Sequence, residues 1–71
     1  MTTTYEMTAY WTGCVLKCTE SFSFFKRGSK YYCFADEGHT FWIHAPFLME
    51  SYGVEQINMS AENRKYFTVD A

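Results

Sequence analysis

Aromatic side chains are dense in this chain, and that density constrains the fold more than any other feature. Seven Phe, six Tyr and two Trp make up 21% of the 71 residues. Each aromatic side chain buries roughly 150–250 Å² when it packs, whereas a domain of about this size buries only about 60% of the surface that its unfolded chain exposes. Because the interior cannot hold every ring, we expect some of them to form an apolar surface patch of the kind that marks an interaction site.

Length and charge limit the class of protein. A chain of 71 residues holds one hydrophobic core, so we expect a single domain over residues 1–71. Six Lys and Arg against eight Asp and Glu give a net charge of −2, which does not favour a general nucleic-acid binder, because such binders neutralise several phosphates. We find neither a secretory signal nor an apolar run near the roughly 20 residues of a membrane helix. We therefore expect a cytoplasmic protein with no membrane partner.

The three cysteines are Cys14, Cys18 and Cys33. An odd number without a secretory signal argues against a disulfide framework. In a strand, Cys14 and Cys18 would share a face but lie about 13 Å apart at ~3.3 Å per residue, which is too far for two ligands of one tetrahedral zinc. We therefore expect three reduced, largely buried thiols rather than a metal site completed by Cys33, His39 or His44. We expect no cofactor.

In the N-terminal half, apolar and polar residues alternate over residues 4–11, which predicts a strand with one apolar face. The parity of the apolar positions changes at residues 12–13, which suggests a bulge or a sharp bend. Inward-facing side chains are then predicted at Cys14, Leu16 and Cys18. Residues 19–23 are predicted to form a loop and residues 24–30 a turn, in which Gly28 is free to adopt a positive φ.

A hairpin is predicted from residues 31–35 and 40–44, with the turn at Asp36-Glu37-Gly38. A three-residue loop pairs Ala35 with His39. It places one set of side chains on one face, namely Tyr31, Cys33, Phe41 and Ile43, and another set opposite, namely Tyr32, Phe34, Trp42 and His44. A two-residue loop at Glu37-Gly38 instead groups Tyr32 and Phe34 with Phe41 and Ile43, because a slip of one residue moves every side chain of a strand across the sheet. We prefer the three-residue loop.

The C-terminal part begins where Pro46 ends the hairpin. Residues 46–52, followed by Gly53, predict one or two helical turns, with a plain loop as the alternative. A weak strand over residues 54–59 and a turn at residues 60–63 precede a closing strand over residues 64–70, with Phe67 and Val69 inward. The whole pattern predicts a mainly all-β domain, either a small five-stranded β-barrel or a rolled antiparallel sheet, with at most one short helical turn.

Four short groups of residues along the chain support a resemblance. They are Leu16-Lys17-Cys18, then Phe25, Gly28 and Tyr31 spaced by three, then Phe41-Trp42-Ile43, and finally Tyr66-Phe67. This series, which covers residues 15–69, is similar to that of small uncharacterised bacteriophage proteins. The resemblance implies an SH3-like β-barrel. It implies no catalytic or binding residue.

The residue types that most often carry out chemistry have simpler interpretations here. Asp36 and Glu37 are adjacent in a turn, where we expect them to serve turn formation and solubility instead of acting as a catalytic pair. His39 is expected to be an exposed turn residue. A nucleophilic Cys18 or Cys33 would need a neighbouring base and an electropositive setting, and the sequence shows neither. We do not expect an enzyme.

The aromatic face of the hairpin is the expected site of function, because Trp and Tyr often anchor interfaces. We expect a protein-binding module that uses Tyr32, Phe34, Trp42, His44, Phe47, Met49 and Tyr52. Together with the resemblance, this suggests a phage protein that binds a protein of the host cytoplasm, such as a polymerase, a nuclease or a defence complex, and inhibits or redirects it. The alternatives are that these rings are covered within the monomer or form a homodimer seam.

A basic cluster gives a second functional hypothesis. Lys26, Arg27 and Lys30 lie next to Tyr31 and Tyr32, and single strands are held by base stacking on aromatic rings combined with backbone charge. Three cations against eight acids form a weak footprint, so we rank nucleic acid below a protein partner. A self-associating structural protein is the third hypothesis.

Overall fold

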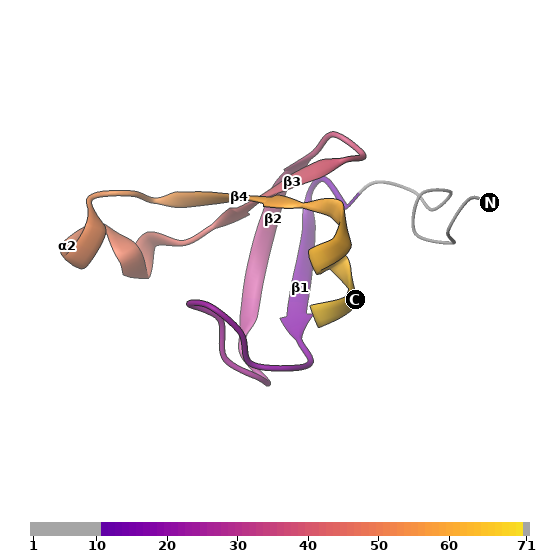
Figure 1. The fold of residues 1–71 in the computed structure, drawn as a ribbon, viewed down its shortest axis with the longest axis horizontal. Coiled ribbons are helices and arrows are strands. Elements are labelled where there is room, and N and C mark those ends of the chain that lie inside the picture. Colours follow the sequence, from indigo (N-terminus) through magenta and orange to yellow (C-terminus); the bar gives the residue numbers. More distant parts are fainter. Residues whose placement is uncertain (1–10, 71) are drawn as a thin grey trace.

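The computed structural model describes residues 11–70, and these form an antiparallel sheet with the strand order β4-β3-β2-β1-β5. The strands are β1 Cys14–Cys18, β2 Lys30–Asp36, β3 Thr40–His44, β4 Gln56–Ser60 and β5 Phe67–Val69. In Figure 1, β1 and β2 run upright whereas β4 runs across the picture, so the sheet is bent between them. The prediction of a mainly all-β domain with a rolled antiparallel sheet is confirmed. The strand expected over residues 4–11 falls almost entirely outside the described residues.

The β2–β3 hairpin has a register that differs from both predictions. Asp36 pairs with Phe41, and the Glu37 N–H donates to the Thr40 carbonyl at 2.8 Å. The two residues at the tip of the hairpin are therefore 38 and 39, one position later than either predicted loop. Gly38 has a φ of 94°, and a glycine is favoured at the first position of a two-residue hairpin turn.

A bulge in β2 then restores the predicted faces. The register shifts between Cys33 and Ala35, beyond which Cys33 pairs with Ile43. The preferred three-residue loop would have placed Cys33 opposite Phe41, which is two positions away. Because side chains alternate with a period of two, a shift of two residues leaves each side chain on its predicted face. The pairing was wrong, but Cys33, Phe41 and Ile43 do lie together in the core.

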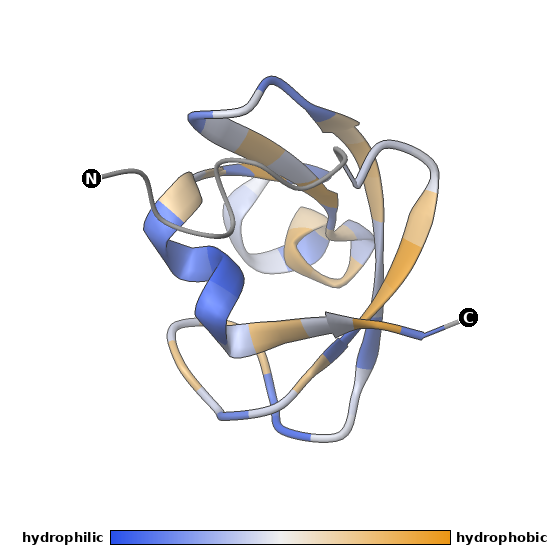
Figure 2. Cartoon of the chain, turned by 90° about the vertical axis from the view of Figure 1, so that its right-hand side faces the viewer, coloured by the Kyte–Doolittle hydropathy of each residue, from blue (hydrophilic) through white to orange (hydrophobic). Residues whose placement is uncertain are grey.

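The core lies on the inner face of the bent sheet. Its buried members are Leu16, Cys18, Phe25, Cys33, Phe41, Ile43, Met59 and Phe67. The inward positions predicted for Leu16, Cys18 and Phe67 are confirmed, whereas Cys14 is only partly buried and Val69 is 45% exposed. Figure 2 shows the strands curling around this interior, with a hydrophilic helical segment beside them.

Two helical segments interrupt the strands. The first consists of η1 Pro46–Leu48 and α2 Met49–Tyr52, so the predicted helical turns over residues 46–52 are confirmed. It ends at Gly53, whose φ of 71° is left-handed and whose N–H donates to the Met49 carbonyl at 2.8 Å. This segment and its flanks, residues 45–55, project from the body of the molecule in Figure 1, and we call them the arm.

The second helical segment is η2 Ala61–Tyr66, a 3₁₀ helix. The closing strand was predicted from residue 64, but β5 begins only at Phe67. The physical reason is Arg64, whose buried side chain turns toward the hairpin and binds Asp36, a contact that no local pattern reveals. Within residues 11–70, no helix has the length and apolar character needed to cross a membrane.

Candidate protein-docking surface

The outer face of β2, β3 and β4 carries a row of directly paired residues. Tyr32 pairs with His44, and His44 pairs with Gln56. Together with Phe34, these three residues line a hollow of about 430 Å³. Tyr32 is 45% exposed, so its ring stands at the surface. Strand alternation explains the arrangement, since the neighbours Cys33 and Ile43 point into the core.

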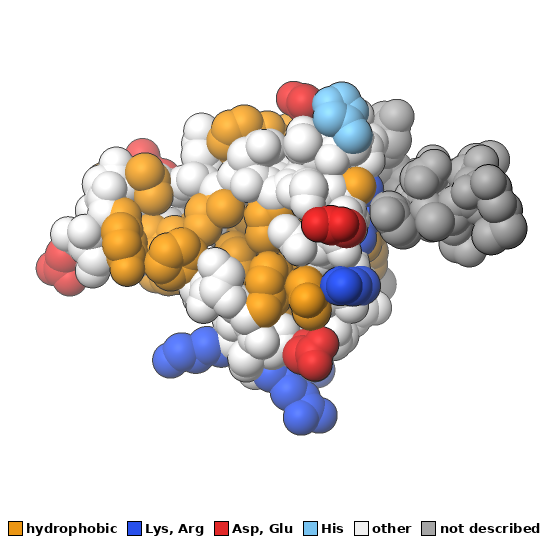
Figure 3. All heavy atoms as spheres, viewed as in Figure 1, with side chains coloured by type: hydrophobic (Ala, Val, Ile, Leu, Met, Phe, Trp, Pro, Cys, Tyr) orange, Lys and Arg blue, Asp and Glu red, His pale blue; other side chains and the backbone are white. Residues whose placement is uncertain are grey.

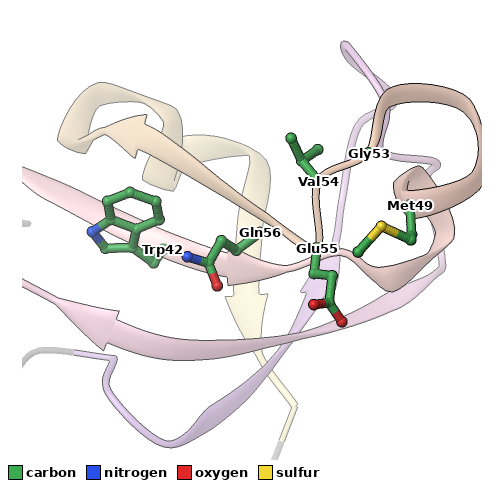
Figure 4. A pocket seen from close by; sticks show the side chains of 6 residues that line it. All are labelled: Trp42, Met49, Gly53, Val54, Glu55 and Gln56. Carbon is green, nitrogen blue, oxygen red and sulfur yellow. The ribbon is translucent and has the colours of Figure 1, made fainter.

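A second hollow of about 400 Å³ lies beside the first, where β4 meets the arm. It is lined by Trp42, Met49, Gly53, Val54, Glu55 and Gln56. Figure 4 shows Gln56 directed toward Trp42, with Val54 and Met49 contributed by the arm. Gln56 lines both hollows, and the rings of Trp42 and Phe34 lie 6.2 Å apart. The two hollows therefore adjoin at Gln56, and we call them together the β2–β4 groove.

The structure divides the predicted surface into two parts. Five of its seven residues line the β2–β4 groove, namely Tyr32, Phe34, Trp42, His44 and Met49. The other two lie elsewhere. Phe47 packs near Tyr31, with ring centroids 5.8 Å apart, and Tyr52 packs against Phe24 at 5.1 Å. Phe47 and Tyr52 lie away from the groove because the arm is helical, and successive side chains of a helical turn point in different directions.

Sequence reasoning missed the part of the groove where the arm continues into β4. Val54, Glu55 and Gln56 line it, but none was predicted as a site residue. They reach the groove because β4 pairs with β3 over its whole length, from Thr40–Ser60 to His44–Gln56. Residues 54–59 gave only a weak strand signal, and a strand signal does not reveal its partner.

Charge is unevenly distributed over the described surface, although the exposed Glu20 lies in the same β1–β2 loop as Lys26 and Arg27. Residues 45–63 contain three exposed acids, Glu50, Glu55 and Glu62, and no Lys or Arg. Four exposed cations lie where β1 ends and β2 begins. Lys17 of β1 pairs with Lys30 of β2, and Lys26 and Arg27 lie in the loop between the two strands. Figure 3 shows Lys and Arg side chains along the lower edge of the molecule, and an acidic side chain at the tip of the arm.

Of the two tyrosines predicted to lie beside the basic cluster, only Tyr31 does so. Tyr31 lies beside it, and its hydroxyl accepts the Lys26 N–H at 3.0 Å while its ring packs on Phe25 at 4.9 Å. Tyr32 belongs to the opposite face of β2 and lines the groove. Lys30 is paired with Asp70 at 3.0 Å. Lys17 was not predicted as part of this cluster, because its position opposite Lys30 depends on the β1–β2 register.

Asp36 and Cys33 are two buried groups near the hairpin, and the burial of Cys33 agrees with its prediction. Asp36 was expected in a solvated turn, but it is buried. Burial opposes its charge, yet hydrogen bonds from Arg64, Trp11 and Gly38 prevail and lower the pKa of its carboxyl below the ordinary 3.8. Burial, reinforced by the nearby Asp36 charge, raises the pKa of Cys33 from 9.0 to about 11. Asp36 is therefore a paired anion, and Cys33 is a protonated thiol and a poor nucleophile.

Among residues 11–70, no three His, Cys, Asp or Glu side chains are grouped so that they could hold a metal ion. Comparison with protein-family models, with curated proteins and with solved structures gave no match. The interpretation of the groove therefore depends on its geometry and chemistry.

Proposed function

We propose that this chain is a non-enzymatic protein-binding module that docks on its partner through the β2–β4 groove. The supporting observation is that two adjoining hollows share Gln56 and are lined mainly by apolar and aromatic side chains. A groove with aromatic anchors and a polar edge has the composition of an interface centre. The resemblance to phage proteins makes a protein of the infected bacterium the partner to seek, and docking would inhibit or redirect that protein.

Within the groove, Tyr32 and Trp42 are the proposed anchors. Tyr32 is exposed on the β2 side, and Trp42 is partly buried between Phe34 and the arm. Rigid rings of this kind supply large contact areas at low cost in side-chain entropy. Truncation of such an anchor typically costs at least about 2 kcal/mol of binding free energy, or roughly thirtyfold in Kd.

The test uses variants that leave the core intact. Tagged wild-type protein captures partners from host lysate, and the captured partner is then purified for titration calorimetry. We expect Tyr32→Ala and Gln56→Arg each to raise Kd by roughly thirtyfold. Val69→Ala is the matched control, because Val69 is equally exposed at 45% but lies on β5, at the far side of the sheet. Unchanged binding by both groove variants, with unfolding curves like those of the wild type, would contradict the proposal.

A second candidate function is binding of single-stranded nucleic acid at the basic end. It is favoured by one observation, the gathering of Lys17, Lys26, Arg27 and Lys30 around the β1–β2 loop. Binding of labelled oligonucleotides would then weaken steeply as salt is raised. The double variant Lys26→Glu/Arg27→Glu would abolish it, whereas Lys65→Glu, which makes one charge change outside the cluster, would reduce it little. Absence of binding at low salt would exclude this candidate.

A further inference from the structure

Strand β4 lies at the edge of the described sheet, where it pairs only with β3. Two hydrogen bonds bracket the strand: the Ala45 N–H donates to the Glu55 carbonyl at 2.6 Å, and the Ala61 N–H donates to the His39 carbonyl at 2.8 Å. Hydrogen-bonded pairs alternate along an antiparallel ladder, so odd-numbered residues of this strand direct their backbone groups toward β3. Gln56 and Asn58 consequently direct theirs away from the sheet.

Among the described residues, nothing covers these outward backbone groups. Gln56 and Asn58 are both exposed, and within residues 11–70 no backbone or side-chain group hydrogen-bonds to their outward N–H or carbonyl groups. An edge of this kind is a template for an added strand. Partners that bind by strand addition gain affinity from the main chain and specificity from pockets for alternate side chains.

The β2–β4 groove supplies such a pocket directly beside the edge. Trp42 pairs with Asn58, and it lines the second hollow together with Gln56 and Val54. A strand added to β4 would place every second side chain on this outer face. These side chains would lie beside Gln56 and Asn58, one strand further out than Trp42, and an apolar side chain next to Gln56 would enter the hollow that Gln56 shares with Trp42 and Val54.

Charge distinguishes between two possible occupants of the edge. Glu55 precedes β4 and Glu62 follows it, and the arm adds Glu50, with no Lys or Arg in residues 45–63. If two copies paired antiparallel through β4, the Glu55 end of one strand would face the Glu62 end of the other, and like charges in that position destabilise a pair. A segment with Lys or Arg on both sides of an apolar centre is complementary instead.

We propose that the β4 edge binds an extended basic segment of the partner by β-strand addition. Its backbone would bond to Gln56 and Asn58, an apolar side chain would occupy the pocket at Trp42 and Val54, and its cations would face Glu55 and Glu62. This inference deepens the proposed function and depends on it, since it names the kind of segment that the groove accepts.

The test uses a synthetic peptide of about nine residues, with valines at alternate central positions and two lysines at each end. Binding to isotope-labelled protein is followed by NMR. We expect the largest shifts at the Gln56 and Asn58 amides and at the Trp42 indole, with slower hydrogen exchange at those two amides. A peptide with the same side chains but N-methylated at alternate residues, so that it cannot donate to β4, should bind about tenfold more weakly or worse. A peptide with glutamates in place of the lysines should not bind.

Protein variants test the edge from the other side. Asn58→Pro removes an outward N–H that the β3–β4 ladder does not use, and proline is tolerated at such edge positions. We expect it to fold and to lose about tenfold in peptide affinity, whereas Asn58→Ala should bind like the wild type. Glu55→Lys should weaken binding, and Glu37→Lys, the same charge change at the hairpin, should not. If Asn58→Pro does not fold, the N-methylated peptide decides the question.

Two results would overturn strand addition while leaving the proposed function intact. One is equal binding of the parent and N-methylated peptides. The other is capture of a partner that depends on Tyr32 but is unaffected by Asn58→Pro. Conversely, the peptide could add to β4 while the affinity of the captured partner is unchanged by Tyr32→Ala and Gln56→Arg. That result would support strand addition at the edge and contradict the proposed docking surface.

Discussion

Arg64 of η2 binds the carboxylate of Asp36, which lies 28 residues earlier at the end of β2, and both side chains are buried. Arg64 also donates to the Gly38 carbonyl at 2.8 Å and lies over the rings of Trp11 and Phe41. Asp36 accepts the Trp11 N–H at 3.0 Å and the Gly38 N–H at 2.9 Å. The pair therefore ties three segments together: the chain before β1, the hairpin and η2.

Removal of either partner should destabilise the protein strongly. Asp36→Asn or Arg64→Met leaves one buried charge without its counterion, which typically costs about 3–5 kcal/mol. Urea unfolding measures this cost. The control is Lys65→Met, because Lys65 is the exposed neighbour of Arg64 and such surface changes usually stay within about 0.5 kcal/mol. Equal effects of Arg64→Met and Lys65→Met would contradict the structural role of the pair.

The Asp36 pKa also predicts how stability depends on pH. Its folded pKa lies below the ordinary value, so the folded state binds this proton less readily than the unfolded state. The stabilisation is therefore complete above the unfolded pKa, which is the ordinary 3.8, and is lost as the pH falls through the lower folded pKa. Urea unfolding from about pH 6 down to about pH 2 should show a loss of stability that Asp36→Asn reduces. An identical acid slope in wild type and variant would be the contrary result.

The cysteines should differ in reactivity. Cys18 and Cys33 are fully buried whereas Cys14 is partly exposed, and burial raises the pKa of Cys33 to about 11. Only the thiolate reacts with alkylating reagents, so Cys14 should be modified first in the native protein, and all three should react after unfolding. Mass spectrometry of peptides from briefly treated protein measures the order. Early labelling of Cys33 would be inconsistent with this core.

A small core deletion tests the packing assignment. Ile43 is fully buried, and Ile43→Val should cost about 0.5–1.5 kcal/mol of unfolding free energy because one methylene leaves a closely packed site. Val69→Ala also removes apolar carbon, but at an exposed position on β5, and should change stability by less than about 0.5 kcal/mol. Thermal unfolding of the two variants compares them, and the reverse order would mean that the inner face has been misassigned.

The sequence predicts those parts of the fold that depend on local periodicity. Alternation places Leu16 and Cys18 inward, and the proline and glycine at residues 46 and 53 bracket the helical arm. What it does not predict depends on distant contacts. The bulge after Cys33 and the Asp36–Arg64 pair arise from the way strands and η2 meet, and neither leaves a signal within a few residues.

The candidate site divides in the same way. Alternation along β2 and β3 places Tyr32, Phe34 and Trp42 on one face only with the preferred three-residue loop, and in the structure the bulge after Cys33 produces the same faces. The contribution of β4 to that face requires knowledge of which strand pairs with β3, and Gln56 was therefore missed. The prediction adds Phe47, Met49 and Tyr52 from the segment after Pro46, but the helical arm brings only Met49 to the groove and turns Phe47 and Tyr52 elsewhere.

The uneven placement of charge also affects how a partner would arrive. Lys17, Lys26, Arg27 and Lys30 at one end, with Glu50, Glu55 and Glu62 along the arm and β4, give the molecule an electric dipole. Such a field acts over about 10 Å at moderate salt, so it turns a charged molecule before the surfaces touch and speeds productive encounters. Added salt would then lower the association rate of the partner. The dissociation rate would depend mainly on the apolar contacts around Trp42 and would change less.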